Sequence, residues 1–369
     1  MKKFKTDKKQ EYFAYRILAN EKIINKNVHK NEYNKLFDKL LFLLKPLQSP
    51  FFDDLKIWVV LSIKWEFDYL SRYLSNPLHL NKSISKYIEI VEIYINLAKN
   101  NWIENIFVKK KNVNEWTRTN HSFNFMWPRN TKGKFYNSSK KIITPRVGQI
   151  IKMLPKNFIK NSIILDSGCG PARYINEFLR HRPKLVYGMD QGKDIIKTNK
   201  RKYSKNKKVR FLVGDVSSLK FKNNFFDFVC SSGVLHHSKN KISNSIQEHA
   251  RVLKKTGYMF VFIVGHGGMQ LKMWQFCRDL LEDVKIEYVF NYLKNKISPL
   301  RLQGFLDHSY GEYQETKRED FEKILKKYFK IIKRVPGIEG ADCTPEIYRK
   351  DKYFKTRFGS GDLRYICKK

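Results

Sequence analysis

The sequence has 369 residues, of which 42% are hydrophobic and 14% aromatic, and this content excludes a wholly disordered chain. The length predicts two domains, or one domain with a large appendage. The formal charge of +38 suggests a polyanionic partner. However, Lys greatly outnumbers Arg and the basic residues are spread along the chain, so we interpret the charge mainly as a compositional bias.

The cysteines and the apolar segments also limit the class of protein. No two of the five cysteines have Cys-x-x-Cys spacing, which argues against a disulfide framework and a Cys-based zinc site, and we expect no metal. No apolar stretch of signal-peptide length follows the basic start of the chain. The most apolar window, 57–63, is too short to span a bilayer, so a cytoplasmic protein is expected.

Residues 1–115 are predicted to form an α-helical accessory domain. Apolar residues recur at i, i+3 and i+4 within 34–47, 54–74 and 81–100, which is the pattern of amphipathic helices. Such a domain could be a dimerisation surface, a substrate cap or a membrane-surface contact, and the pattern does not choose among them. The oligomeric state is equally open. Just downstream, the aromatic segment 122–127 is interpreted as a hydrophobic anchor rather than a substrate contact.

From about residue 159 the pattern changes to short apolar runs that alternate with amphipathic stretches. This alternation predicts a doubly wound α/β fold with a mostly parallel sheet that is covered on both faces. The predicted strands are 162–166, 184–190, 209–215, 226–231 and 258–264. The predicted helices between them are 171–181, 192–203 and 242–255.

Three of these strands end in carboxylates, at Asp166, Asp190 and Asp215. In such folds the ligand lies beyond the carboxyl ends of the strands. A carboxylate at the second strand end can accept hydrogen bonds from ribose hydroxyls, and one at the third from an adenine amine. Gly168 and Gly170 allow a tight turn close to a ligand. Together these residues predict a nucleoside pocket.

The motifs ILDSGCGPAR, GMD, GDVSSL, FDFVCSSGVLHH and RVLKKTGYMFVF follow one another between about residues 145 and 265. This series resembles the class I S-adenosylmethionine-dependent methyltransferases, in particular the type 11-like branch that methylates small molecules, lipids and sugars. The sequence departs from the family at Ser167, which is usually Leu or Ile, and at Pro171-Ala172, which is usually Thr-Gly. The turn Lys255-Thr256-Gly257 stands where the family usually has Pro-Gly-Gly.

The resemblance implies S-adenosylmethionine as the cofactor and assigns roles to individual residues. The methionine end would lie at the first strand, the ribose at Asp190, the adenine at Asp215 and Val216, and the sulfonium at the serines after strand four. The implied cofactor-binding residues are Asp166, Gly168, Cys169, Gly170, Asp190, Gln191, Asp215, Val216, Ser231 and Ser232. His236 or His237 is suited to removing a proton from the acceptor, although a packing role is the alternative.

The resemblance also implies seven strands, and segments 329–335 and 362–368 fit an antiparallel closing pair. The methyltransferase domain would thus cover 116–369, with a core at 145–265, an insert at 266–327 and closing strands at 328–369. Within the insert, 269–283 and 284–293 are predicted helices, and the insert would form a lid over the acceptor. Its candidate acceptor contacts are His266, Asp307, His308 and Tyr310, for which surface loop positions are the alternative.

The leading hypothesis is methyl transfer to a small molecule, a lipid or a sugar. RNA or protein methylation is the alternative, although Cys230-Ser231-Ser232-Gly233 replaces the Asn/Asp-Pro-Pro-aromatic motif of base amino-methylating enzymes. A nucleic-acid acceptor is therefore disfavoured. A non-catalytic cofactor-binding scaffold is a third hypothesis, and the near-complete set of cofactor motifs argues against it.

Overall fold

The computed structural model describes residues 32–47, 52–72, 76–101, 115–131, 133–339 and 341–369. Parts of the predicted accessory domain, residues 1–31 and 102–114, lie outside the described residues. Among the described residues, no helix is long and apolar enough to cross a membrane.

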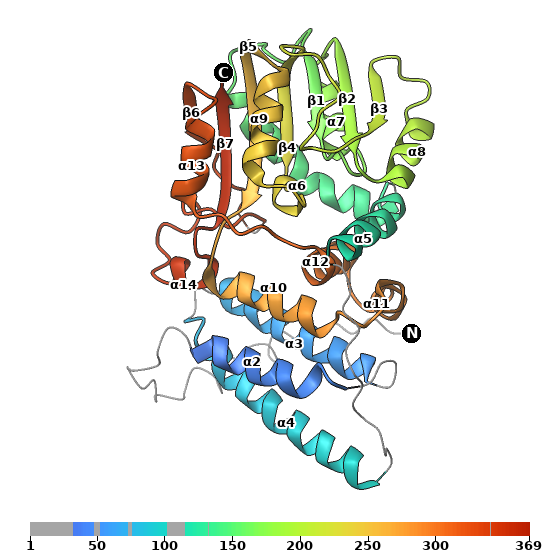
Figure 1. Ribbon diagram of the computed structural model, residues 1–369, viewed down its shortest axis with the longest axis vertical. Helices are drawn as coiled ribbons and strands as arrows, with labels where there is room; N and C mark the ends of the chain where they lie inside the picture. Colours follow the sequence, from blue (N-terminus) through green and yellow to red (C-terminus); the bar gives the residue numbers. More distant parts are fainter. Residues whose placement is uncertain (1–31, 48–51, 73–75, 102–114, 132, 340) are drawn as a thin grey trace.

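A seven-stranded sheet forms one end of the molecule (Figure 1), and its strand order is β3-β2-β1-β4-β5-β7-β6. Neighbouring strands among β1 to β5 pair in parallel, and β7 pairs antiparallel with both β5 and β6. The strands are β1 (Ile163–Ser167), β2 (Leu185–Asp190), β3 (Val209–Val213), β4 (Phe226–Ser232), β5 (Leu253–Val264), β6 (Ile331–Arg334) and β7 (Asp362–Lys368). The predicted fold class and the antiparallel closing pair are confirmed.

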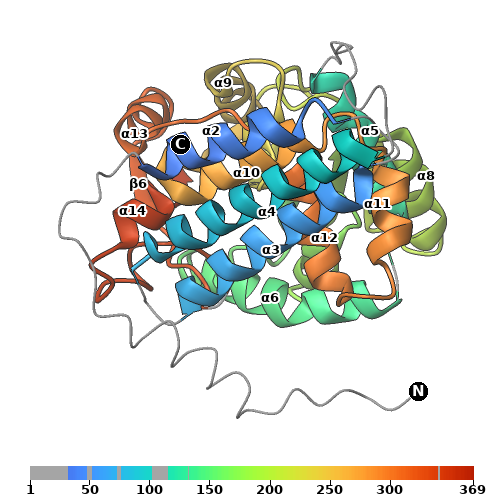
Figure 2. The ribbon, with the colours of Figure 1, turned by 90° about the horizontal axis from the view of Figure 1, so that it is seen from below.

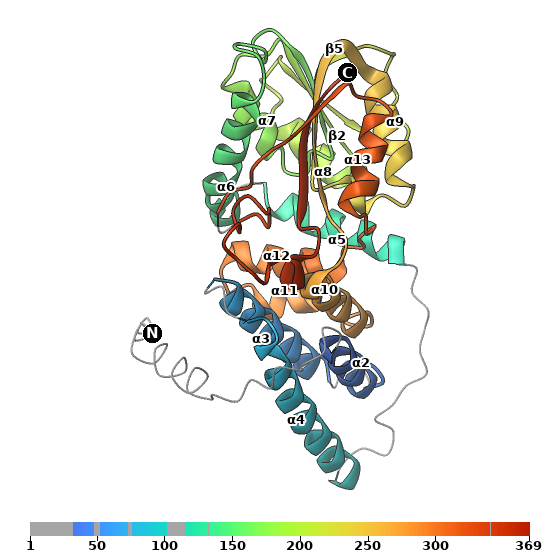
Figure 3. The same ribbon diagram turned by 90° about the vertical axis from the view of Figure 1, so that its left-hand side faces the viewer.

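Helices cover both faces of the sheet, as its continuous apolar strands require. Figure 3 shows the sheet nearly edge-on, with α6 and α7 on one side and α9 and α13 on the other. The bounds of the flanking helices are α6 (Gly133–Lys152), α7 (Arg173–Leu179), α8 (Lys193–Lys202), α9 (Ile242–Val252) and α13 (Arg318–Lys326). Two buried apolar clusters, one on each face, form this part of the core.

Several predicted boundaries differ from the observed ones: the helix expected over 269–283 ends at Leu280, and among the strands the start of β5 differs most. The helix expected over 242–255 ends at Val252, and the turn expected at 255–257 lies inside β5. Strand pairing explains the difference, because Leu253 pairs with Phe226 across the ladder. Lys254 then places its Nζ 2.7 Å from Oδ1 of Asp227 in β4. Tertiary pairing thus overrides the helical pattern of these residues.

A helical layer lies beyond the carboxyl ends of the parallel strands (Figure 1). It contains the predicted N-terminal helices, here α2 (Glu32–Leu44), α3 (Asp53–Arg72) and α4 (His79–Asn101). Figure 2 shows these three helices running side by side. The insert contributes α10 (Gly268–Leu280), α11 (Ile286–Leu293) and α12 (Pro299–Tyr310), and α14 (Phe354–Phe358) lies next to α10. The helix α5 (Glu115–Arg129) lies between this layer and the sheet.

The N-terminal helices and the insert share one hydrophobic core. The rings of Phe37 in α2 and Phe276 in α10 have centroids 5.1 Å apart. The buried Nζ of Lys56 in α3 lies 2.7 Å from Oδ2 of Asp283, just after α10. The helices before residue 115 therefore pack directly against the insert after β5. The division of the chain into two domains at residue 115 remains a prediction.

Candidate active site

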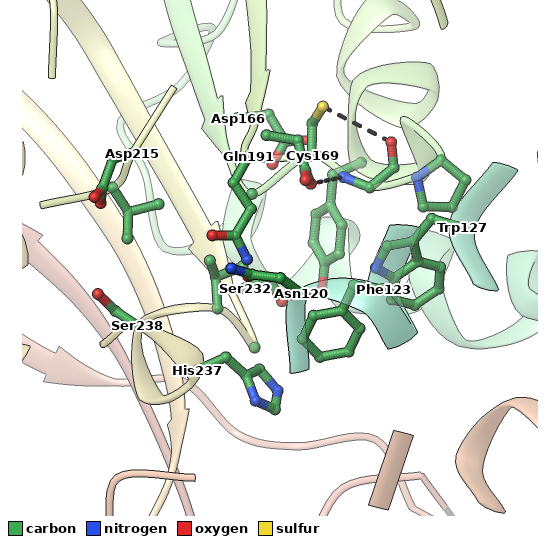
Figure 4. A pocket seen from close by; sticks show the side chains of 18 of the residues that line it. Asn120, Phe123, Trp127, Asp166, Cys169, Gln191, Asp215, Ser232, His237 and Ser238 are labelled. Carbon is green, nitrogen blue, oxygen red and sulfur yellow. Dashed lines mark hydrogen bonds between the residues drawn. The ribbon is translucent and has the colours of Figure 1, made fainter. Parts of the chain in front are cut away.

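A cavity of about 310 Å³ lies at the carboxyl ends of β1, β2 and β4, and α5 and α12 contribute to its wall (Figure 4). It brings together residues from six segments that are far apart in the sequence. The side of the sheet contributes Asp166, Gly168, Cys169, Gly170, Asp190, Gln191, Asp215, Val216, Ser232 and His237. The helices contribute Asn120, Phe123, Trp127, Arg173, Tyr174 and Asp307.

The carboxylate of Asp190 connects the loops that follow β1 and β2. Its Oδ2 accepts from the backbone N–H of Gly170 and its Oδ1 from that of Gly192, both at 2.9 Å. Gly168 has a φ of +81°, and a Cβ there would lie 2.3 Å from a methyl group of Val234. The first loop can therefore pass this close to the cavity only with glycine at that position.

Asp166 is buried at the end of β1 and lines the cavity, and its Oδ2 has no hydrogen-bond partner among the described residues. Burial, and next the charge of Asp190, raise the pKa of this carboxyl to about 7. A buried carboxylate without a partner is costly unless a ligand supplies a donor or a positive charge. The residue therefore fits a cationic group such as an ammonium.

Most of the other predicted cofactor residues also lie in the cavity wall. Asp215 is exposed and accepts from the backbone N–H and the hydroxyl of Ser217, both at 2.8 Å. The Ser232 hydroxyl lies 2.8 Å from that of Tyr174. Ser231 is the exception, because its side chain is fully buried and does not line the cavity.

The structure separates the two candidate catalytic histidines. His237 lines the cavity, and its Nδ1 lies 2.5 Å from the carbonyl oxygen of Glu312. Because a carbonyl only accepts, Nδ1 carries the proton and Nε2 is left as an acceptor. Burial lowers the pKa of His237 to about 4, so the ring is neutral at pH 7. His236 instead stacks on Tyr313, accepts from the backbone N–H of Val264 and does not line the cavity.

Of the candidate acceptor contacts in the insert, only Asp307 lines the cavity. His308 stacks on Trp274 at 3.8 Å, and the Tyr310 hydroxyl donates to the carbonyl of Val284 at 2.8 Å. These neighbours diverge because they lie on α12, where successive side chains point about 100° apart. His266 lies outside the cavity wall, with Nδ1 2.6 Å from Oε2 of Glu315.

The helix α5 was not predicted to belong to the site. Phe123 and Trp127, in the segment interpreted as a hydrophobic anchor, both line the cavity together with Asn120. Phe123 packs edge-on against His237 with ring centroids 4.9 Å apart, and the guanidinium of Arg173 lies 5.4 Å from the ring of Trp127. Residues 120, 123 and 127 are separated by three and four positions, so they lie on one face of α5. This spacing is the sequence feature that could have indicated their place in the site.

A second buried histidine explains why a serine stands at position 167. The Nε2 of His249 in α9 lies 2.9 Å from the Ser167 hydroxyl, and its Nδ1 lies 2.5 Å from the carbonyl of Ser245. Both side chains are fully buried. The hydrogen bond joins the end of β1 to α9. The serine that stands in place of the family's Leu or Ile therefore has a hydrogen-bond partner for its buried hydroxyl.

A sheet of this order, with acidic strand ends around one cavity, defines a class I S-adenosylmethionine-dependent methyltransferase fold. Residues 165–261 match the family model described as "Methyltransferase domain". This segment contains β1, β2, β3, β4 and most of β5 together with the loops that line the cavity. The chain therefore contains a class I methyltransferase domain.

Among curated proteins, the chain is similar to a tRNA (carboxymethyluridine(34)-5-O)-methyltransferase of Arabidopsis thaliana. The two are 28% identical over 131 residues, which cover 35% of this chain and 29% of that protein. Similar solved structures include the PH0226 protein of Pyrococcus horikoshii, at 16% identity and a TM-score of 0.41, covering 67% of this chain and 97% of that one. Another is a SAM-dependent methyltransferase from Aquifex aeolicus, at 13% identity and a TM-score of 0.38, covering 65% and 97%.

Proposed function

We propose that the protein transfers the methyl group of S-adenosylmethionine to an oxygen atom of its acceptor, with His237 accepting the proton. The observation that carries this proposal is the 2.5 Å contact between Nδ1 of His237 and the carbonyl oxygen of Glu312. The Nδ1–H of His237 is held by the Glu312 carbonyl, which leaves Nε2 free to accept from a hydroxyl in the cavity. The packing of Phe123 against the ring helps to fix its orientation.

The described residues fit the cofactor, which supplies an activated methyl group when bound. Asp166 would face the ammonium of the methionine part, because its buried Oδ2 lacks a partner. A carboxylate offers about four lone-pair sites, so Asp190 can accept from a ribose hydroxyl as well as from the backbone N–H groups of Gly170 and Gly192. Asp215 and the backbone of Val216 would contact the adenine, and Ser232 would lie near the sulfonium.

The acceptor would enter between the sheet and the helices α5 and α12. Its part of the cavity is lined by Phe123, Trp127 and Asp307, which suit a compact and partly planar group with one polar end. A small molecule, a lipid head group or a sugar meets this description. An RNA nucleoside turned out of its strand meets it too, and the named activity of the Arabidopsis thaliana relative favours that second candidate.

The test begins with calorimetric titration of S-adenosylmethionine into wild type and Asp190→Ala. The variant loses the ribose contact and both loop hydrogen bonds, so the affinity should fall by about tenfold or more. Asp194→Ala is the matched control, because that exposed residue on α8 removes the same charge and does not line the cavity. Equal affinities for the two variants would contradict the assigned cofactor site. No binding to wild type would contradict an autonomous methyltransferase and would favour a degenerate scaffold or a pocket that forms only with a partner.

Cofactor binding should also release protons at pH 7. Asp166 has a pKa of about 7 in the free protein, and a neighbouring ammonium would lower it, so roughly half a proton should leave per cofactor bound. Calorimetry in buffers of different ionisation enthalpy measures this number directly. The number of protons released should fall toward zero by about pH 9, where the Asp166 carboxyl is already ionised before the cofactor binds. Unchanged proton release in Asp166→Asn would contradict the assignment.

A further inference from the structure

The positive charge is not evenly distributed, contrary to the interpretation made from composition. The helices α2, α3 and α4 together contain eight Lys and Arg residues and eight Asp and Glu residues. The segment 193–210, which contains α8 and the start of β3, has nine Lys and Arg residues and one Asp. A uniform compositional bias would enrich both regions alike. The local excess at 193–210 therefore requires another explanation.

These nine residues and Lys140 of α6 are named here the basic face. All ten are exposed, and none forms a salt bridge with an acidic side chain in the part of the chain that the structure describes. The Nζ atoms of Lys202 and Lys140 lie 3.8 and 5.8 Å from the centroid of the Tyr136 ring. Burial, and next the charge of Lys140, lower the pKa of Lys202.

The basic face begins at the rim of the cavity. Gln191 lines the cavity, Gly192 is hydrogen-bonded to Asp190, and α8 starts at the next residue. Positions 193, 197, 200 and 201 follow one face of α8, a stripe about 12 Å long at 1.5 Å per residue. A polyanion on this stripe would therefore lie next to the cavity.

The chemistry of the basic face favours RNA over a membrane surface. Helices that bind a membrane surface combine cations with exposed aromatic or aliphatic side chains. Segment 193–210 exposes no large hydrophobic side chain, and its apolar residues, such as Ile195 and Ile196, are buried. The aromatic wall formed by Phe123 and Trp127 suits the stacking of a base that has left its strand.

We propose that the basic face binds the phosphodiester backbone of an RNA and that a nucleoside of this RNA is the methyl acceptor. This inference rests on the proposed function, because it names the acceptor class of the same cavity. The cations of α8 hold the backbone beside Gln191, and one nucleoside reaches into the cavity toward His237. Contacts of this kind fix the position of the RNA and do not read its sequence.

The experiment measures binding of a fluorescent RNA stem-loop to the full chain by anisotropy over a range of salt concentrations. The variant Lys197→Gln/Lys200→Gln/Arg201→Gln removes three cations from the basic face. Lys326→Gln/Lys327→Gln/Lys330→Gln is the matched control, since it removes three exposed cations beside β6 at the other edge of the sheet. The first variant should weaken binding about tenfold or more at ~0.1 M salt and reduce the slope of log K against log salt by about 2. The control should bind as wild type does.

Equal weakening in both variants would overturn the inference, because only net charge would then matter. Binding to vesicles with anionic lipids that exceeds binding to the stem-loop would overturn it in favour of a membrane surface. Titration of S-adenosylmethionine into the same proteins separates this result from the proposed function. Loss of RNA binding with intact cofactor binding concerns the basic face alone, whereas a wild type that binds RNA but no cofactor would contradict the proposed methyl transfer.

Discussion

Replacing His237 with asparagine should lower kcat by about 10²–10⁴-fold and leave the affinity for S-adenosylmethionine unchanged. The asparagine amide can still donate to the Glu312 carbonyl, as Nδ1 of the histidine does, but it has no atom in the place of Nε2. The variant therefore removes the proton acceptor and keeps the local hydrogen bond. Because burial lowers the pKa of His237 to about 4, the wild-type rate should show no loss from this group between pH 8 and pH 5.

The matched control is His266→Asn, in the insert. His266 is half-exposed, pairs with Glu315 and lies outside the cavity wall, so kcat should stay close to that of wild type. Single-turnover kinetics with labelled cofactor would measure both variants. A His237→Asn enzyme with the wild-type single-turnover rate would show that the acceptor loses its proton without this residue.

Replacing Asp342 with alanine should lower the free energy of unfolding by about 3–5 kcal/mol. The Asp342 carboxylate is fully buried between the guanidinium groups of Arg146 in α6 and Arg364 in β7, and it also accepts from the backbone N–H of Ile338 at 2.7 Å. Burial alone would raise the pKa of Asp342, but the two arginines hold it below its usual value. Without the carboxylate, the buried guanidinium of Arg364 would lose its ion-pair partner.

Urea unfolding of Asp342→Ala and Asp320→Ala would measure the difference. Asp320 forms an exposed pair with Lys323 at 4.0 Å, and the loss of such a pair costs about 1 kcal/mol or less. Similar losses in the two variants would show that the buried group of charges does not hold α6 against the closing strands.

The strands were predictable because each is a short apolar run bounded by polar or turn residues. The five parallel strands were found with at most two residues of error at their carboxyl ends, which is where the acidic residues lie. The start of β5 was missed because residues 253–255 continue the helical pattern and 255–257 resemble a turn, and this segment becomes a strand only through pairing with β4. A single sequence does not contain that long-range information.

The cavity residues that follow the strands were predicted from the sequence, whereas those on α5 were not. Loops after parallel strands converge on one edge in any fold of this kind, so motif positions fixed their placement. The contribution of Phe123 and Trp127 depends on how α5 packs on α8 and α12, which no local pattern specifies. The residues 307–310 were treated as one cluster, whereas α12 directs Asp307, His308 and Tyr310 to three different surroundings.

The core shared by α2, α3 and α4 with α10, α11 and α12 has a consequence for how this architecture could have arisen. Loss of either stretch would expose the apolar face of the other to water, at about 25 cal/mol for each Å² uncovered. We expect related chains to contain both stretches or neither, so that the two are inherited as one unit although the whole methyltransferase motif series separates them in the gene.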